Sequence, residues 1–185
     1  PEALRVSELY RIVRPYGGTA YICSSERSFS RIKEWLVNAG IPENEITSTN
    51  QWAKIVRGNL PGAGQWTHTL GNPGRTASSE DQIVKLPLEM LWFGGPGPAR
   101  MVNRHWYAPV PLCVNGRLFI SGEYTLTAVD AFNGREMWCR ERKGRSSKDR
   151  TDIVADDRYV YATEGRSVLQ INGDTGDIVQ VYQPP

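Results

Sequence analysis

The chain has 185 residues, a formal net charge of +2 and a hydrophobic fraction of 39%. These values suit a folded chain with a buried core, and so small a charge argues against a nucleic-acid surface. No apolar run is long enough for a membrane span. The sequence lacks an initiator Met and a signal-peptide layout, so we expect a piece of a longer protein whose compartment stays open.

The cysteines and histidines do not form a recognisable site. Cys23, Cys113 and Cys139 form no Cys-x-x-Cys pair, and an odd number argues against a disulfide framework. His68 and His105 have no clustered acidic partner at metal-ligand spacing. We therefore expect no metal site in this chain.

The first third of the chain alternates between helical and strand patterns. Leu4 to Val13 has apolar residues at helical spacing, and Thr19 to Cys23 is rich in strand formers. Ser28 is placed to cap a second helix. Two closely spaced strand candidates follow at 45–50 and 52–57. Their spacing predicts a hairpin, and hence an antiparallel pair at the edge of a sheet otherwise built by helix crossovers.

This order of helix, strand, helix and hairpin resembles the carboxyl half of a class I S-adenosylmethionine-dependent methyltransferase. The segment from Glu8 to Cys23, ELYRIVRPYGGTAYIC, is similar to the family's helix and Pro-Gly-Gly turn, with Tyr16 interposed. The resemblance implies an α/β, Rossmann-like domain half over residues 1–59. Gly17 and Gly18 follow a helix rather than a strand, the wrong order for a cofactor cradle. We therefore expect no S-adenosylmethionine site here and assign that cofactor, if any, to the parent protein.

A change of composition marks the middle of the chain. Residues 60–74 are rich in Gly, Pro, Asn and Thr without periodicity, which predicts a linker before a second domain at 75–185. Glu80 and Asp81 follow two serines, and we expect them to cap a turn rather than to act as a carboxylate pair. The run from Leu86 to Phe93 has the composition of a strand.

The clearest signal is a repeat in the last part of the chain. Asn115 to Trp138 contains two apolar runs and an Asn-Gly turn into a third strand, the pattern of an antiparallel meander. A weaker copy runs from Asp156 to Tyr182, in which Arg158 aligns with Arg117. The offset of roughly 42 residues lies in the range of one four-stranded propeller blade.

The first copy reads A-x-D-A-x-N-G-x-x-x-W, which resembles the A-L-D-A-x-T-G-x-x-x-W signature of PQQ-like (quinoprotein alcohol dehydrogenase-like) β-propeller repeats. The second copy departs from it, with Asn172 replacing the Asp and Gly173 the Ala. The resemblance implies an all-β carboxyl part of about two antiparallel blades, whose partners are the remaining blades of the parent chain. Its signature residues are Asp130, Asn133, Gly134, Trp138 and Gly176.

One loop offers a candidate for ligand binding. Arg104, His105, Trp106 and Tyr107 precede the first repeat and together could hold an anionic or flat ligand, or a protein partner. The alternative is a loop that locks blades together. In the resembled family the quinone is contacted by many blades, together with calcium and an aspartate. Two blades do not supply those contacts, so we expect no PQQ bound by this chain.

These observations favour one class of function and leave two others open. The first is an interaction or scaffold module without a complete catalytic site in this chain. The second is a part of a methyltransferase–propeller fusion enzyme. The third is a quinone-dependent oxidoreductase. We expect neither a nucleic-acid partner nor a membrane span.

Overall fold

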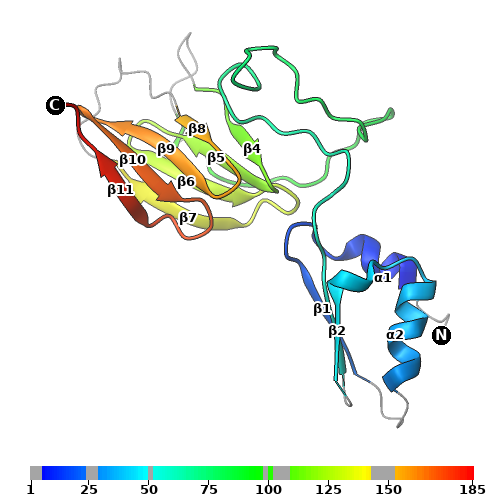
Figure 1. The fold of residues 1–185 in the computed structure, drawn as a ribbon. Helices are drawn as coiled ribbons and strands as arrows, with labels where there is room; N and C mark the ends of the chain where they lie inside the picture. The colour runs from blue at the N-terminus through cyan, green and yellow to red at the C-terminus, as the bar shows by residue number, and fades with distance from the viewer. Residues whose placement is uncertain (1–5, 24–28, 50–51, 98–99, 102–108, 143–152) are drawn as a thin grey trace. The chain divides into compact units, whose positions relative to one another are not determined.

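The computed structural model describes residues 6–23, 29–49, 52–97, 100–101, 109–142 and 153–185. The chain separates into two compact units, Pro1–Pro61 and Gly62–Pro185. Three antiparallel sheets dominate the described residues, which contain only two short α-helices (Figure 1). In this described part, no helix combines the length and the apolar character needed to cross a membrane.

The first unit is a three-stranded antiparallel sheet with two helices and a 3-10 turn. The sheet has the order β1-β3-β2, so the last strand lies in the centre. The elements are, in chain order, α1 (Val6–Ile12), β1 (Thr19–Cys23), α2 (Phe29–Asn38), η1 (Glu43–Glu45), β2 (Ile46–Ser48) and β3 (Trp52–Val56).

The core of this unit lies between α2 and the central strand. Leu36 of α2 and Ala53 and Ile55 of β3 are fully buried there. Ala53 and Ile55 are two positions apart, so both side chains point to the same face of the sheet. Helix α1 ends against Arg57, whose guanidinium donates to the carbonyl oxygens of Tyr10, Arg11 and Val13 at 3.1, 3.0 and 2.5 Å.

The prediction of a Rossmann-like α/β piece over residues 1–59 is wrong. Its helices and strands lie close to the predicted ranges, but every strand pairing in the unit is antiparallel. Strand β1 pairs with β3 along its whole length, with Thr19 opposite Val56 and Cys23 opposite Trp52. A Rossmann unit needs neighbouring parallel strands joined by helical crossovers. The methyltransferase-like half therefore does not describe this unit, and Ser28 lies outside the described residues.

The second unit contains two four-stranded antiparallel sheets, in which each strand pairs with the next along the chain. The predicted meander is present in both copies, and a short strand precedes each. The first sheet consists of β4 (Leu112–Val114), β5 (Arg117–Ser121), β6 (Thr125–Asp130) and β7 (Glu136–Glu141). The second consists of β8 (Ile153–Ala155), β9 (Tyr159–Glu164), β10 (Ser167–Asn172) and β11 (Ile178–Tyr182).

Strand pairing gives the register of the repeat. Arg117 lies opposite Asp130 in the first sheet, and Tyr159 lies opposite Asn172 in the second, so equivalent positions are 42 residues apart. Each sheet also has an irregularity at the same place in its last strand pair. The predicted alignment of Arg158 with Arg117 is therefore shifted by one residue. A shift of one moves a side chain to the other face of a strand, so the error matters.

One hydrophobic core joins the two sheets. Its largest fully buried side chain is Phe119, whose ring centroid lies 6.1 Å from that of Trp138. Both sheets contribute alternate residues of their strands, which places one face of each against the other. The core consists of Leu112, Val114, Phe119, Leu126, Ala128 and Trp138 from the first sheet and Ile153, Ala155, Val160, Ala162, Leu169 and Ile171 from the second.

The segment at 62–97 belongs to the second unit and forms no regular helix or strand. The backbone of Trp66 pairs with that of Cys113, at 2.8 and 3.0 Å, and so extends the sheet beyond β4. The predicted strand at Leu86 to Phe93 is wrong. Pro87 has no N–H to give to a ladder, and none of the strands in the described residues pairs with this run.

Candidate functional site

Trp138 joins the first sheet to a turn of the second. Its indole Nε1 donates to the carbonyl oxygen of Gly173 at 2.9 Å, and the residue is only 9% exposed. The ring lies against Gly176, where an added Cβ would be 2.8 Å from Trp138 Cδ2. Gly176 also has a φ of +78°, so both the turn and the contact require glycine.

Trp92 makes the same arrangement one repeat earlier. Its Nε1 donates to the carbonyl oxygen of Ala131 at 2.8 Å, and a Cβ on Gly134 would clash with its ring. Ala131 and Gly173 are equivalent in the 42-residue register, as are Gly134 and Gly176. In both cases the indole ring packs on a turn and its N–H donates to a backbone carbonyl of that turn. We call this arrangement the tryptophan dock. It occurs on both sheets.

The turns that receive the tryptophans are closed by their own first residue. Asp130 is buried, and its Oδ1 accepts a hydrogen bond from the amide of Phe132 at 2.8 Å. In the second sheet, Asn172 Oδ1 accepts from the amide of Asp174 at 2.9 Å. Asn133 Oδ1 accepts in turn from the amide of Arg135 at 2.9 Å. Asp and Asn can exchange here because both supply an acceptor oxygen at the same distance from the backbone.

Arg117 provides a second junction that the sequence pattern does not reveal. Its side chain is almost fully buried, and its Nη2 donates to the carbonyl oxygen of Asp157 at 2.6 Å. Its Nη1 lies 3.2 Å from the carboxylate of Asp174, and its Nε donates to Val114 within its own sheet. One guanidinium thus satisfies acceptors on both sheets. The only sequence signal is an Arg at an inward position of a strand.

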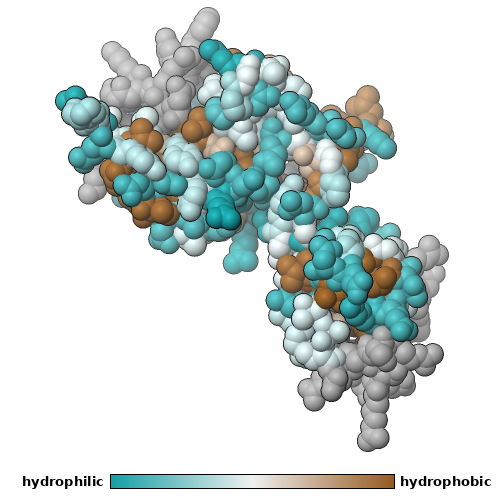
Figure 2. All heavy atoms as spheres, viewed as in Figure 1, coloured by the Kyte–Doolittle hydropathy of each residue, from teal (hydrophilic) through white to brown (hydrophobic). Residues whose placement is uncertain are grey.

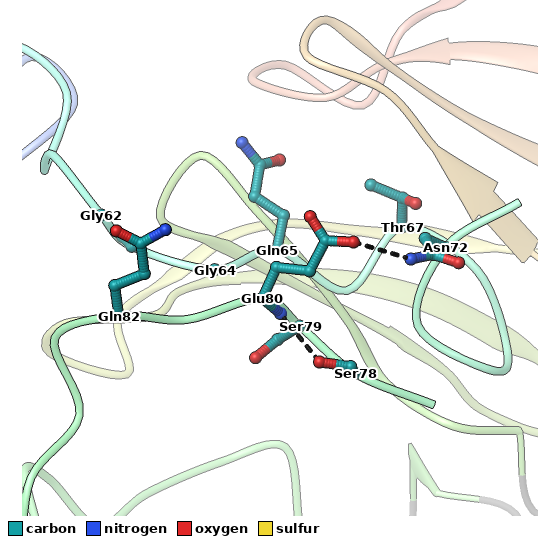
Figure 3. A pocket seen from close by; sticks show the side chains of 10 residues that line it. Gly62, Gly64, Gln65, Thr67, Asn72, Ser78, Ser79, Glu80 and Gln82 are labelled. Carbon is teal, nitrogen blue, oxygen red and sulfur yellow. Dashed lines mark hydrogen bonds between the residues drawn. The ribbon is translucent and has the colours of Figure 1, made fainter. Parts of the chain in front are cut away.

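The entry segment of the second unit forms a pocket of about 320 Å³ that is lined mainly by residues with polar side chains (Figure 3). Two stretches of backbone lie side by side there, because Gln65 N donates to Ser79 O at 3.1 Å and Gln82 N to Gly62 O at 2.9 Å. Glu80 carries the only charged side chain in the lining. The full lining is Gly62, Ala63, Gly64, Gln65, Thr67, Asn72, Ser78, Ser79, Glu80 and Gln82.

Asp81 stabilises the backbone that forms this pocket. Its carboxylate accepts from the amides of Gly64, Ile83 and Val84 at 2.7, 2.9 and 2.7 Å. These hydrogen bonds, the one from Gly64 first, lower the pKa of Asp81 below its ordinary value. Asp81 therefore caps backbone amides, whereas the carboxylate of Glu80 points toward Asn72, whose Nδ2 lies 3.4 Å away (Figure 3).

The segment around the pocket holds three non-glycine residues in the left-handed region, of which only Glu80 lines the pocket. Arg75, Ala77 and Glu80 have φ angles of +56°, +53° and +59°. Such residues are uncommon, and they often gather where a loop must hold a particular shape. The lining offers hydroxyl, amide and carboxylate oxygens, and it includes no histidine or cysteine. It therefore suits a small group with N–H or O–H donors.

The predicted ligand loop at Arg104, His105, Trp106 and Tyr107 lies outside the described residues. Of the remaining predicted residues, Trp138 and Gly176 are brought together in one dock, and Gly134 lies against Trp92 in the other. Asp130 and Asn133 accept hydrogen bonds from amides of their own turn. In the described ranges, no group of three or more His, Cys, Asp or Glu side chains could hold a metal ion. Cys23, Cys113 and Cys139 are free thiols, and burial raises the pKa of the Cys113 thiol.

No protein-family model matches the chain, and no curated protein matches it.

Proposed function

We propose that the second unit is part of an interaction or scaffold module, built from repeated antiparallel sheets of the β-propeller type with PQQ-like repeats. The tryptophan dock carries this proposal, because Trp92 and Trp138 engage equivalent turns one repeat apart. The two sheets also share strand order and register, and antiparallel four-stranded sheets are compatible with propeller blades.

Such a frame supports binding because it holds loops in fixed positions. Each dock ties a turn of one sheet to a strand or segment of the preceding repeat, and Arg117 adds a second tie. Loops on a rigid frame are where binding residues usually lie. The pocket at Glu80 lies on such loops, and its single carboxylate favours a partner that presents donors or a cation.

The test is affinity capture with the immobilised chain, compared among wild type, Glu80→Lys and Glu34→Lys. Glu34 is exposed on α2 of the first unit and serves as the control for added charge. We expect a defined protein partner that wild type and Glu34→Lys retain and that Glu80→Lys loses. Equal capture by all three chains, or tight binding of PQQ with dye reduction, would contradict the proposal.

A further inference from the structure

Strand β11 is the last strand of the second sheet, and it is unusually apolar for an edge. Its five residues, IVQVY, are all exposed and include no charge. Val179, Val181 and Tyr182 are 52%, 41% and 49% exposed. Figure 2 shows hydrophobic side chains gathered over the part of the second unit where Figure 1 places this strand. In the described residues, no strand pairs with its outer edge.

Strand β7 occupies the same position in the first sheet and provides an internal comparison. Its sequence, EMWCRE, carries three charges, and Glu136 also forms a salt bridge with Arg100 at 2.7 Å. Charged side chains on an edge strand oppose pairing with another chain, because the charges would lose water or meet their like. The protein therefore protects the edge at β7 and leaves the edge at β11 open to a strand.

We propose that β11 pairs edge to edge with β11 of a second copy of this chain, antiparallel and about a two-fold axis at Gln180. An open edge presents unpaired N–H and C=O groups, and only another extended backbone satisfies a row of them. The two sheets then become one continuous sheet across the dimer. This interface is independent of the proposed partner-binding function, and a monomeric chain would leave that proposal untouched.

The side chains of β11 are complementary to themselves in this register. Val179 faces Val181 of the second copy, Ile178 faces Tyr182, and the two Gln180 amides face each other. Pairs of β-branched residues and pairs of β-branched with aromatic residues favour antiparallel association, and no like charges meet. A two-fold interface uses the same patch on both copies, so the assembly closes at the dimer.

The first measurement is the mass of the full chain by sedimentation and light scattering, from about 5 µM to about 500 µM, because a two-copy equilibrium shifts with concentration. We expect the mass to rise from one chain to two and to stop there. A monomer over this whole range would overturn the proposal. So would open-ended growth, since the two-fold pairing leaves no second free β11 edge.

Charge variants then test whether β11 forms the contact. Val179→Lys/Val181→Lys places lysines opposite lysines, and Val179→Glu/Val181→Glu places glutamates opposite glutamates. We expect each to weaken its homodimer at least about tenfold. A mixture of the two should restore a dimer, because each Lys then faces a Glu. Homodimers that persist in both variants, or a mixture that stays monomeric, would contradict the interface.

Single variants test the orientation. In the antiparallel register, Val179→Lys on one chain meets Val181→Glu on the other, so this mixture should form a heterodimer. In a parallel register, position 179 of one chain would instead lie opposite position 179 of the other. If Val179→Lys paired preferentially with Val179→Glu, that result would overturn the proposed register. Val168→Lys is the control, since it adds a charge on β10, which is not an edge strand. Its dimer should match wild type, and circular dichroism should show that every variant is folded.

Discussion

The indole nitrogen of Trp138 lies 2.9 Å from the carbonyl oxygen of Gly173, and this hydrogen bond links a strand of one sheet to a turn of the next. The two residues are 35 positions apart in the chain. A buried carbonyl that loses its donor has no water to replace it. Trp138 therefore contributes both packing and a specific polar contact to the junction.

Trp138→Phe and Trp138→Ala should separate these two contributions. The Phe variant keeps most of the ring but loses the N–H, and we expect a loss of about 1–3 kcal/mol in the free energy of unfolding. The Ala variant leaves a cavity and should lose about 3–5 kcal/mol. Urea unfolding of the second unit measures both. Tyr124→Ala, at a 57% exposed side chain of the same unit, should change the midpoint little.

Gly176→Ala should be far more harmful than Gly165→Ala. Both glycines have a left-handed backbone, with φ of +78° and +59°, so both variants bear the strain of about 1–2 kcal/mol that a Cβ meets there. Only at Gly176 would the new Cβ press on Trp138; at Gly165 nothing lies within 4 Å. We expect an additional loss of about 1–3 kcal/mol for Gly176→Ala. Equal unfolding midpoints for the two variants would show that the indole does not lie on this turn.

Arg117→Lys should destabilise the second unit although the charge is conserved. A lysine cannot reach Asp157 and Asp174 with separate donors in the fixed geometry of a guanidinium, so we expect a loss of about 1–3 kcal/mol. Asp174→Asn removes the ionic partner instead. The Asp174 side chain is 70% exposed, and such a pair is screened by water, so the cost should stay below about 1 kcal/mol. Thermal unfolding of both variants checks this order.

Asp81→Asn should change the pH dependence of stability. The folded pKa of Asp81 is lowered by amides that favour the carboxylate, so its stabilisation is present above the unfolded pKa and is lost as pH falls through the folded pKa. We expect the variant to be less stable than wild type near neutral pH. The two urea midpoints should converge at pH values below the ordinary 3.8 of an aspartate. Glu89→Gln is the matched control, because it neutralises an exposed carboxylate of the same segment.

Local patterns placed the helices and most strands of this chain correctly, but they wrongly predicted a strand at Leu86 to Phe93. The Asn133-Gly134 pair and the alternating runs around it marked a turn between strands, because a tight turn requires a positive φ that few residues tolerate. The helix at Val6–Ile12 and the strand at Thr19–Cys23 also lie where their periodicity placed them. These features depend on residues close together in sequence.

Local patterns could not predict contacts between residues that are far apart in the sequence. Spacing identified β1 and β3 but could not show that they pair antiparallel, and the family resemblance led to the wrong α/β assignment. The contacts of Arg117 with Asp157 and Asp174, which lie 40 and 57 positions away, left no local signal. The same holds for Trp92, whose segment resembled a strand while its indole docks on the turn at Ala131.

Both docks use a main-chain oxygen as the acceptor. Every amino acid supplies that oxygen, so the hydrogen bond itself does not depend on which side chain stands at the acceptor position. At Gly173 the space is restricted for another reason, since an added Cβ would lie 2.5 Å from Arg117 Nη1. The two turns differ in sequence: one has Asp130 and Ala131 where the other has Asn172 and Gly173. Both indoles nevertheless donate to the equivalent backbone carbonyl. Because the acceptor is a main-chain atom, the two repeats keep the same joint although their sequences differ at these positions.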